Sequence, residues 1–204
     1  MSIHTVIAKP VSRVLNPFFI SIMALLVATY AGTNNLREFG IWTLIILFFT
    51  VIIPVAFVYA RSSRKGSSIR KMPELLSFLR ERRKEVWALV VITGVPFISL
   101  LIILKAPVML MAILVALIGS CLVIALVNRF FKASFHISCV TILAITAVVV
   151  WGQAALPALL VIPLVGWARF SIREHSLIQL AAGFAIALII GNASLHVFGV
   201  PALV

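Results

Sequence analysis

The sequence has 204 residues, of which 63% are hydrophobic and 11% are charged, and its formal net charge is +12. A soluble domain carries about 25% charged residues, so this composition excludes an ordinary soluble domain and indicates an integral membrane protein. The basic excess would suggest nucleic acid as the partner of a soluble protein. Here short basic loops at the ends of membrane helices explain the excess, and we expect no nucleic-acid partner.

The chain begins with a short polar lead, residues 1–13, and then becomes apolar. No convincing cleavage site follows, so we expect the first helix to remain as a membrane anchor. Of seven apolar runs, the sixth is short for a bilayer crossing of about twenty residues, which predicts six or seven transmembrane helices. The expected fold is an all-α, polytopic bundle that forms one membrane domain over residues 1–204. The runs cover residues 14–30, 41–60, 86–104, 108–127, 137–151, 154–167 and 177–198.

The longest polar segment, residues 61–85, separates the second run from the third. It opens with a loop rich in serine and basic residues, and Pro73 and Glu74 then give a helix start signal. Apolar and basic residues follow at helical spacing. This pattern predicts a basic interfacial helix that lies on the membrane surface. Its apolar face would hold Leu75, Leu76, Phe78 and Leu79, and its basic face Arg80, Arg82, Arg83 and Lys84.

The basic residues are distributed unevenly between the two predicted faces of the membrane. With seven spans, one face holds 15 of the 17 lysines and arginines, and the other holds only Arg37 and Lys105. Basic residues accumulate on the cytoplasmic side of membrane proteins. We therefore expect the protein in the cytoplasmic membrane, with the polar face towards the cytoplasm.

Small and sulfur-containing residues have simpler explanations. Cys121 and Cys139 lie in apolar runs without metal-ligand spacing, which favours free thiols over a disulfide. Gly183, Ala187 and Gly191 recur every four residues in the last run. Such a stripe favours close packing of helices, and we expect that packing within the molecule.

Two polar islands, residues 128–136 and 168–179, carry the candidate chemistry. They join pairs of spans on the same predicted face, so folding would bring them together. They contain few carboxylates, which argues against a metal site and favours an anionic ligand. Arginine binds phosphate oxygens through two parallel hydrogen bonds, and helix N-termini add N–H donors. His136 and His175 each stand where a span begins. Two histidines beside cations suggest a nucleophile and a general acid for phosphoryl transfer.

His175 and Gln179 are four residues apart, so on a helix they share a face. The glutamine carbonyl could accept a hydrogen bond from the imidazole and fix its tautomer. The remaining histidines, His4 and His196, we interpret as residues of the membrane interface.

These islands resemble two signatures of the type 2 phosphatidic acid phosphatase superfamily, also called lipid phosphate phosphatases. Lys132-Ala133-Ser134-Phe135-His136 is similar to the second signature, Pro-Ser-Gly-His. Arg169, five residues, His175, three residues and Gln179 are similar to the third, Ser-Arg-x5-His-x3-Asp. The resemblance covers residues 128–191, a phosphatase-like core.

The resemblance implies a role for each residue. His175 would be the nucleophile that forms a phosphohistidine, with Gln179 in the position that orients it, and His136 would protonate the leaving group. Arg169, Lys132 and Ser134 would hold the phosphate, together with Arg82 or Arg83 in place of the first signature. The family needs no metal or other cofactor.

The sequence departs from the family pattern at several positions, as in a divergent member. Ala133, Phe135 and Ala168 replace proline, glycine and serine, and the first signature, Lys-x6-Arg-Pro, is absent. Gln179 replaces aspartate, and an amide cannot stabilise an imidazolium by charge, so a lower rate is expected.

The expected function is hydrolysis of a terminal phosphate monoester or diphosphate of a membrane lipid. An isoprenoid phosphate or diphosphate, phosphatidic acid and phosphatidylglycerophosphate all fit as substrates. The alternatives are a non-catalytic membrane protein that binds lipid phosphates, or a transporter. A transporter would place ionisable groups near the middle of the membrane, and the middles of these runs contain none.

Overall fold

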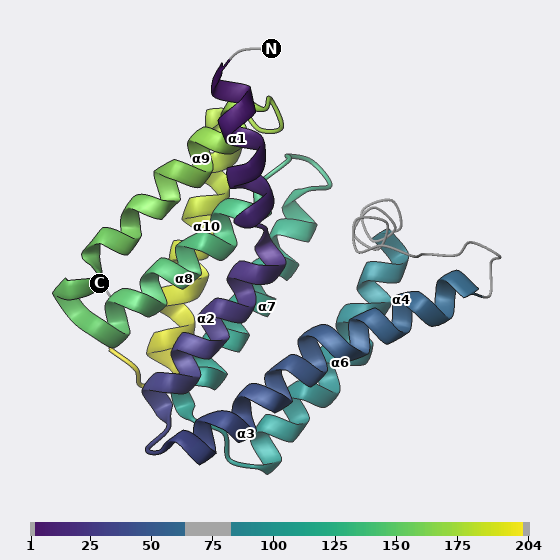
Figure 1. Cartoon of the computed structure of the whole chain (residues 1–204), viewed down its shortest axis with the longest axis vertical. Coiled ribbons are helices and arrows are strands. Elements are labelled where there is room, and N and C mark those ends of the chain that lie inside the picture. The colour runs from purple at the N-terminus through teal and green to yellow at the C-terminus, as the bar shows by residue number, and fades with distance from the viewer. Residues whose placement is uncertain (1–2, 64–82, 202–204) are drawn as a thin grey trace. The chain divides into compact units, whose positions relative to one another are not determined.

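The computed structural model describes residues 3–63 and 83–201, and every element in these ranges is helical (Figure 1). The all-α prediction is thus confirmed for the described residues. The contacts divide the chain into two compact units. The first unit comprises Met1–Asn34 and Pro107–Val204, and the second comprises Asn35–Ala106. That residues 1–204 form one membrane domain stays a prediction.

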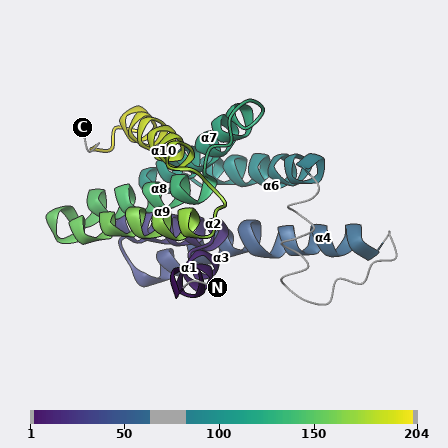
Figure 2. The same ribbon diagram turned by 90° about the horizontal axis from the view of Figure 1, so that it is seen from above.

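The first unit is built around one central helix, α8 (Phe135–Trp151). Figure 2 shows α8 between α10 on one side and α2 on the other, and α8 packs against both. The 3₁₀ segment η2 and helix α9 continue the chain from α8 and pack back against it. The other elements are α1 (Ile3–Val14), α2 (Pro17–Gly32), α7 (Val108–Val127), η2 (Gly152–Leu160), α9 (Val161–Ser171) and α10 (Leu177–Val197).

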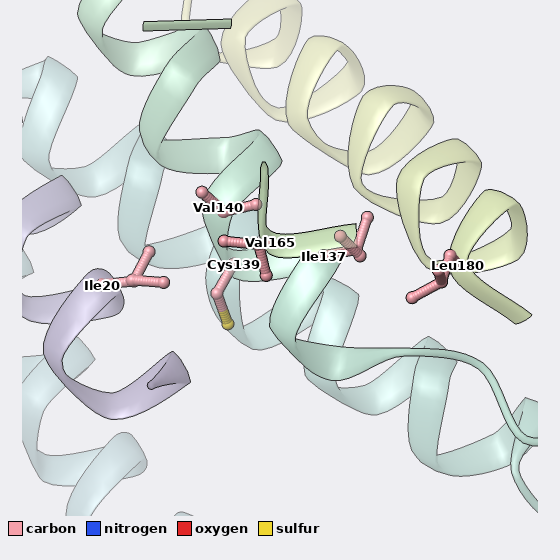
Figure 3. Packing of buried hydrophobic residues seen from close by; sticks show 6 residues of the cluster. All are labelled: Ile20, Ile137, Cys139, Val140, Val165 and Leu180. Carbon is pink, nitrogen blue, oxygen red and sulfur yellow. The ribbon is translucent and has the colours of Figure 1, made fainter. Parts of the chain in front are cut away.

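One cluster of buried apolar side chains in the first unit comes from four helices (Figure 3). Its close packing fixes α9 and α10 against α8, and these helices carry the candidate site at their ends. The cluster consists of Ile20 from α2, Ile137, Cys139 and Val140 from α8, Val165 from α9 and Leu180 from α10.

The small-residue stripe of α10 packs inside the first unit, as predicted. A Cβ atom on Gly183 would overlap the carbonyl oxygen of Ser134 and lie 3.2 Å from its backbone nitrogen. Gly191 similarly lies against Ile145 of α8, and Ala187 is fully buried. The missing side chains let the two backbones approach.

The second unit contains helices α3 (Leu36–Leu47), α4 (Ile53–Ser63) and α6 (Arg83–Ile103), with a π-helical turn η1 (Phe48–Ile52) between α3 and α4. Pro54 has no backbone N–H and cannot complete a regular helical ladder, which accounts for a local change of hydrogen-bond pattern just before it. The rings of Phe49 and Phe97 stack at 5.0 Å and hold η1 against α6.

Large apolar side chains on the outer surfaces of the helices are exposed, among them Leu44, Ile103 and Ile189. A soluble protein rarely exposes so much apolar surface, and lipid would cover it in a membrane. Four helical stretches in the described ranges are long and apolar enough to cross a bilayer, or five if a pair bent by 47° counts as one span. They are Leu36–Phe57, Val108–Val127, Phe135–Ser171 and Leu177–Val197, with Ile7–Val14 and Pro17–Gly32 as the bent pair.

The structure therefore has several helices compatible with an integral membrane protein, while the count of six or seven crossings stays a prediction. The fourth predicted run, residues 108–127, coincides with α7. The stretch Phe135–Ser171 has 37 residues, more than the about twenty that one crossing needs. It includes both the fifth and the sixth predicted runs.

Two features of the N-terminal region were not predicted. The polar lead is helical from Ile3 onwards, and one side of this helix, α1, packs on α9. The first predicted span, residues 14–30, is interrupted at Asn16. The Asn16 side chain accepts a hydrogen bond from the backbone N–H of Phe19, and Pro17 occupies the first helical position, so a new helix begins there.

Most of the predicted interfacial segment, residues 61–85, lies outside the described residues, and so does Arg82. Arg83 is the first residue of α6, but its side chain lies outside the description.

The two cysteines are free thiols, as expected.

Candidate functional site

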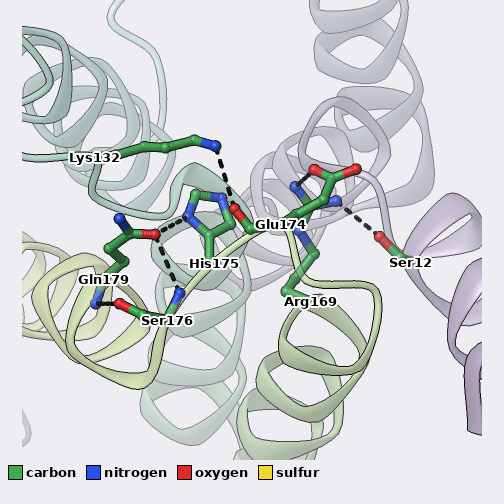
Figure 4. A network of polar contacts seen from close by, with 7 residues as sticks. All are labelled: Ser12, Lys132, Arg169, Glu174, His175, Ser176 and Gln179. Atoms are coloured by element: carbon green, nitrogen blue, oxygen red, sulfur yellow. Dashed lines mark hydrogen bonds and ion pairs between the residues drawn. The ribbon is translucent and has the colours of Figure 1, made fainter.

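The two polar islands meet at one end of the first unit, where the α7–α8 and α9–α10 connections lie side by side (Figure 4). The backbone N–H of Ser134 donates to the carbonyl oxygen of Gln179 at 3.1 Å. The amine of Lys132 donates to the carbonyl oxygen of Glu174 at 3.2 Å. The predicted convergence of residues 128–136 and 168–179 is therefore observed in these contacts.

Local capping determines the shape of the first connection. The side-chain oxygen of Asn128, at the end of α7, accepts a hydrogen bond from the N–H of Ala133 at 2.7 Å. Ser134 occupies the N-cap position of α8 without a side-chain hydrogen bond to the helix, and the lack of a side chain at Gly183 lets its backbone pack on α10. The loop is thereby tied to both flanking helices, with Lys132 exposed at its surface.

The second connection is a tight helix-ending turn. The N–H of Glu174 donates to the carbonyl of Arg169 at 3.1 Å, and the N–H of Arg173 donates to that of Phe170 at 2.9 Å. This pair of bonds is a Schellman motif, which needs a left-handed residue just beyond the helix. Arg173 fills that position with a φ of 57°. The turn places Glu174 and His175 immediately before α10.

Arg169 lies in the last turn of α9, not in a loop as the island 168–179 suggested. Apolar neighbours extend the helix through Ser171, and Arg169 is only 7% exposed. One terminal nitrogen donates to the hydroxyl of Ser12 at 3.0 Å, and the other contacts the carboxylate of Glu174. Both partners were missed by the sequence reasoning. Ser12 is 157 residues from Arg169, so no local sequence pattern indicates their contact. Glu174 is only five residues from Arg169 and could have been considered as its partner.

The imidazole of His175 lies beside Gln179, with 3.2 Å between Nδ1 and the side-chain oxygen Oε1. The backbone N–H of Ser176 donates to the same oxygen at 3.1 Å, which fixes the orientation of the amide. Because Oε1 can only accept, the Nδ1 of a neutral His175 is its donor. The other ring nitrogen, Nε2, is then left with its lone pair.

Burial lowers the pKa of His175 from its ordinary value of 6.5, and the positive charges of Arg169 and Lys132 lower it further. The hydrogen bond to Gln179 and the carboxylate of Glu174 oppose this shift. The net direction is downward, so His175 is neutral at pH 7. A neutral imidazole with a free Nε2 lone pair is the form that can attack an electrophile.

Gln179 also has a structural role that its sequence pattern could have indicated. The hydroxyl of Ser176 accepts a hydrogen bond from the backbone N–H of Gln179. In turn, the side-chain oxygen of Gln179 accepts one from the backbone N–H of Ser176. This is a capping box, recognisable as Ser-x-x-Gln before an apolar run. The same oxygen therefore caps α10 and orients His175.

The remaining predicted residues occupy the start of α8. Ser134 is fully buried, and its hydroxyl has no hydrogen-bond partner within residues 3–63 and 83–201. His136, two residues later, lies in the first turn of α8 and is half-buried. Both stand at a helix N-terminus, where backbone N–H groups and the helix dipole favour an anion.

An open pocket of about 570 Å³ is lined by His175 and by neighbouring residues at the end of α9 and in the α9–α10 connection. Its lining includes Arg173, a cation that the sequence reasoning did not assign to the site. The exposed ring of Phe170 forms part of the same wall. The complete lining is Phe170, Ser171, Arg173, His175 and Ser176.

In the described part of the chain, no group of three or more histidine, cysteine or acidic residues could hold a metal ion. Comparison of the chain with protein-family models, with curated proteins and with solved structures finds no match.

Proposed function

We propose that the protein is an integral membrane lipid phosphatase that removes a terminal phosphate or diphosphate from a lipid through a phosphohistidine intermediate. The observation that carries this proposal is the environment of His175. Its Nδ1 faces Gln179, its pKa is lowered, and the cations Lys132 and Arg169 lie near it. These features favour a neutral nucleophile next to positive charge, which phosphoryl transfer requires.

In the proposed first step, Nε2 of His175 attacks the phosphorus atom of the substrate. The bond between phosphorus and the lipid oxygen breaks, and its electron pair leaves with that oxygen. His136 gives the leaving oxygen a proton, as the resemblance implies. In the second step water attacks the phosphohistidine, a proton passes back to His136, and phosphate leaves as Nε2 regains its lone pair.

Positive charge and N–H donors would stabilise the transferring phosphoryl group. Arg169 and Lys132 border His175, and Arg173 lines the pocket beside it. Ser134 and the first N–H groups of α8 would add donors from the second connection. Arg82 or Arg83 stays the proposed counterpart of the first family signature. The proposed chemistry uses no metal.

The substrate class follows from the position of the site at the end of apolar helices. Leu177 and Ile178, in the first turn of α10, are exposed apolar side chains beside the polar turn. A phosphorylated headgroup could occupy the polar end while its chains remain among such residues. Isoprenoid phosphates, phosphatidic acid and phosphatidylglycerophosphate fit this description. We further propose six or seven bilayer crossings and a cytoplasmic-membrane location with the site facing the cytoplasm.

The test is phosphate release from a panel of lipid phosphates by the purified protein in the presence of a chelator. The wild type should release phosphate, and His175→Ala should abolish release. His136→Ala should slow it by about 10²-fold or more, the usual contribution of a general acid. Equal activity of all three proteins would contradict the assignment.

A second candidate is a lipid-phosphate binder without catalysis. One observation favours it: Gln179 completes a capping box, so helix geometry alone accounts for its contact with Ser176. Such a protein would bind lipid phosphates through the same cations but release no phosphate. The panel of lipid phosphates separates the two candidates when lipid binding and phosphate release are both measured. A phosphatase does both, whereas a binder only binds.

The orientation can be tested at Phe130, which is 94% exposed in the α7–α8 connection. A Phe130→Cys variant should be shielded from a membrane-impermeant thiol reagent in intact cells and react after lysis. Wild-type protein is the control, because its own cysteines are buried or half-buried. Labelling in intact cells would reverse the proposed orientation.

A further inference from the structure

Arg169, the central cation of the proposed phosphate site, is already bound to an anion within the protein. Its guanidinium contacts the carboxylate of Glu174 through one terminal nitrogen and the hydroxyl of Ser12 through the other (Figure 4). A guanidinium binds carboxylate and phosphate through the same planar set of N–H donors. Glu174 therefore engages a donor that a phosphate oxygen would need.

We infer that Glu174 is an internal competitor, an anion that a phosphate ligand must displace from Arg169. The inference rests on the proposed function, because it takes Arg169 as a phosphate-binding residue. The inference goes beyond that function because it assigns Glu174 a role in ligand binding. Neither the residue pattern nor the family resemblance assigned Glu174 any role.

The backbone around Glu174 is held independently of its side chain. The N–H of Glu174 donates to the carbonyl of Arg169, and its carbonyl accepts from Lys132. A rotation of the Glu174 side chain would therefore leave these two backbone bonds, and the turn that positions His175, in place. Ser12 continues to hold the other terminal nitrogen of Arg169 during that rotation.

The displacement of Glu174 costs the same free energy for every phosphate ligand. The carboxylate brings one negative charge to Arg169, so a singly charged phosphodiester gains little by replacing it. A terminal phosphate monoester carries nearly two negative charges at pH 7 and interacts more strongly with the surrounding cations. Glu174 thus weakens both classes of ligand by the same factor, which leaves the diesters of the membrane itself largely unbound while terminal phosphates still bind.

The inference is tested with small soluble probes: methyl phosphate as the monoester and dimethyl phosphate as the diester. Affinity is measured from the rise in unfolding temperature of the detergent-solubilised protein with probe concentration, at constant ionic strength set with chloride. Glu174→Gln should bind dimethyl phosphate about tenfold more tightly than wild type, since the amide oxygen left at this position carries no negative charge and competes less well for Arg169. Its affinity for methyl phosphate should rise at least as much, because the cost of displacing Glu174 is common to both probes. Ser12→Ala, the matched control on the other side of Arg169, should show no such gain for either probe.

Unchanged affinities in Glu174→Gln, or equal gains in Ser12→Ala, would overturn the inference. Failure of either variant to fold is detected by gel filtration, and Glu174→Ala and Ser12→Gly then replace them. The result of this binding experiment does not depend on whether the protein is a phosphatase. Tighter binding by Glu174→Gln without phosphate release by any variant would support the inference and contradict the phosphatase.

Discussion

Nδ1 of His175 lies 3.2 Å from Oε1 of Gln179, and the N–H of Ser176 donates to that same oxygen. A single amide therefore caps α10 and sets the tautomer of the imidazole. In the third signature of the proposed phosphatase family, an aspartate stands in this position. The amide keeps the hydrogen bond but supplies no negative charge to a protonated ring.

The burial of His175 predicts the pH dependence of the wild type, because burial lowers the pKa of its imidazole. The lowered pKa of His175 means that the neutral, nucleophilic form predominates down to a pH below 6.5. The catalytic efficiency kcat/KM should therefore rise with pH and pass through an inflection below pH 6.5. At neutral pH, titration of His175 should no longer change it. A Gln179→Glu substitution places a negative charge near the ring and should move the inflection to higher pH. A wild-type inflection above 6.5 would contradict this.

The two roles of Gln179 can be separated by mutation. Ser176→Ala removes one bond of the capping box and should cost about 1 kcal/mol of stability, because Ser is a preferred N-cap residue. It should leave kcat nearly unchanged. Gln179→Ala removes both the cap and the partner of His175, so it should lower stability by a similar amount and also lower kcat. Equal losses of kcat in the two variants would mean that Gln179 acts only as a cap.

Gly183 is predicted to be intolerant of any side chain, because a Cβ atom would overlap the carbonyl oxygen of Ser134. Gly183→Ala should destabilise the protein by about 1–3 kcal/mol, the usual cost of overpacking. Gly40→Ala is the control, since a Cβ there meets nothing within 4 Å. It should be neutral or slightly stabilising, because alanine favours helix. Thermal unfolding in detergent measures both, and equal effects would contradict the close packing of α8 and α10.

Arg173 and Lys105 form a matched pair, because both are left-handed residues that end a helix. Replacing either by glycine should stabilise the fold by about 1 kcal/mol, since glycine adopts this conformation without a steric penalty. Only Arg173→Gly removes a cation from the pocket beside His175, so only this variant should bind phosphate more weakly. Equal phosphate affinity in the two variants would exclude Arg173 from the site.

The hydrophobic pattern was sufficient to predict the helical class and the bounds of α7, because long apolar runs have few alternative structures. It also predicted that the islands around Lys132 and His175 would meet, since each joins two helices at the same end. It missed the contact between Ser12 and Arg169, which joins residues far apart in sequence and depends on how α1 packs against α9. The capping box at Ser176 was visible in the sequence but was overlooked in favour of a catalytic interpretation.

The central claim is that His175 accepts the phosphoryl group. The most direct measurement is rapid quenching of the enzyme with a lipid substrate labelled in its terminal phosphate, followed by identification of the labelled peptide. Phosphohistidine is stable in alkali and labile in acid, which distinguishes it from phosphoserine. The account predicts alkali-stable label on the peptide that contains His175 in the wild type, and none in His175→Asn. Phosphate release without labelled enzyme, or the same label in His175→Asn, would contradict it.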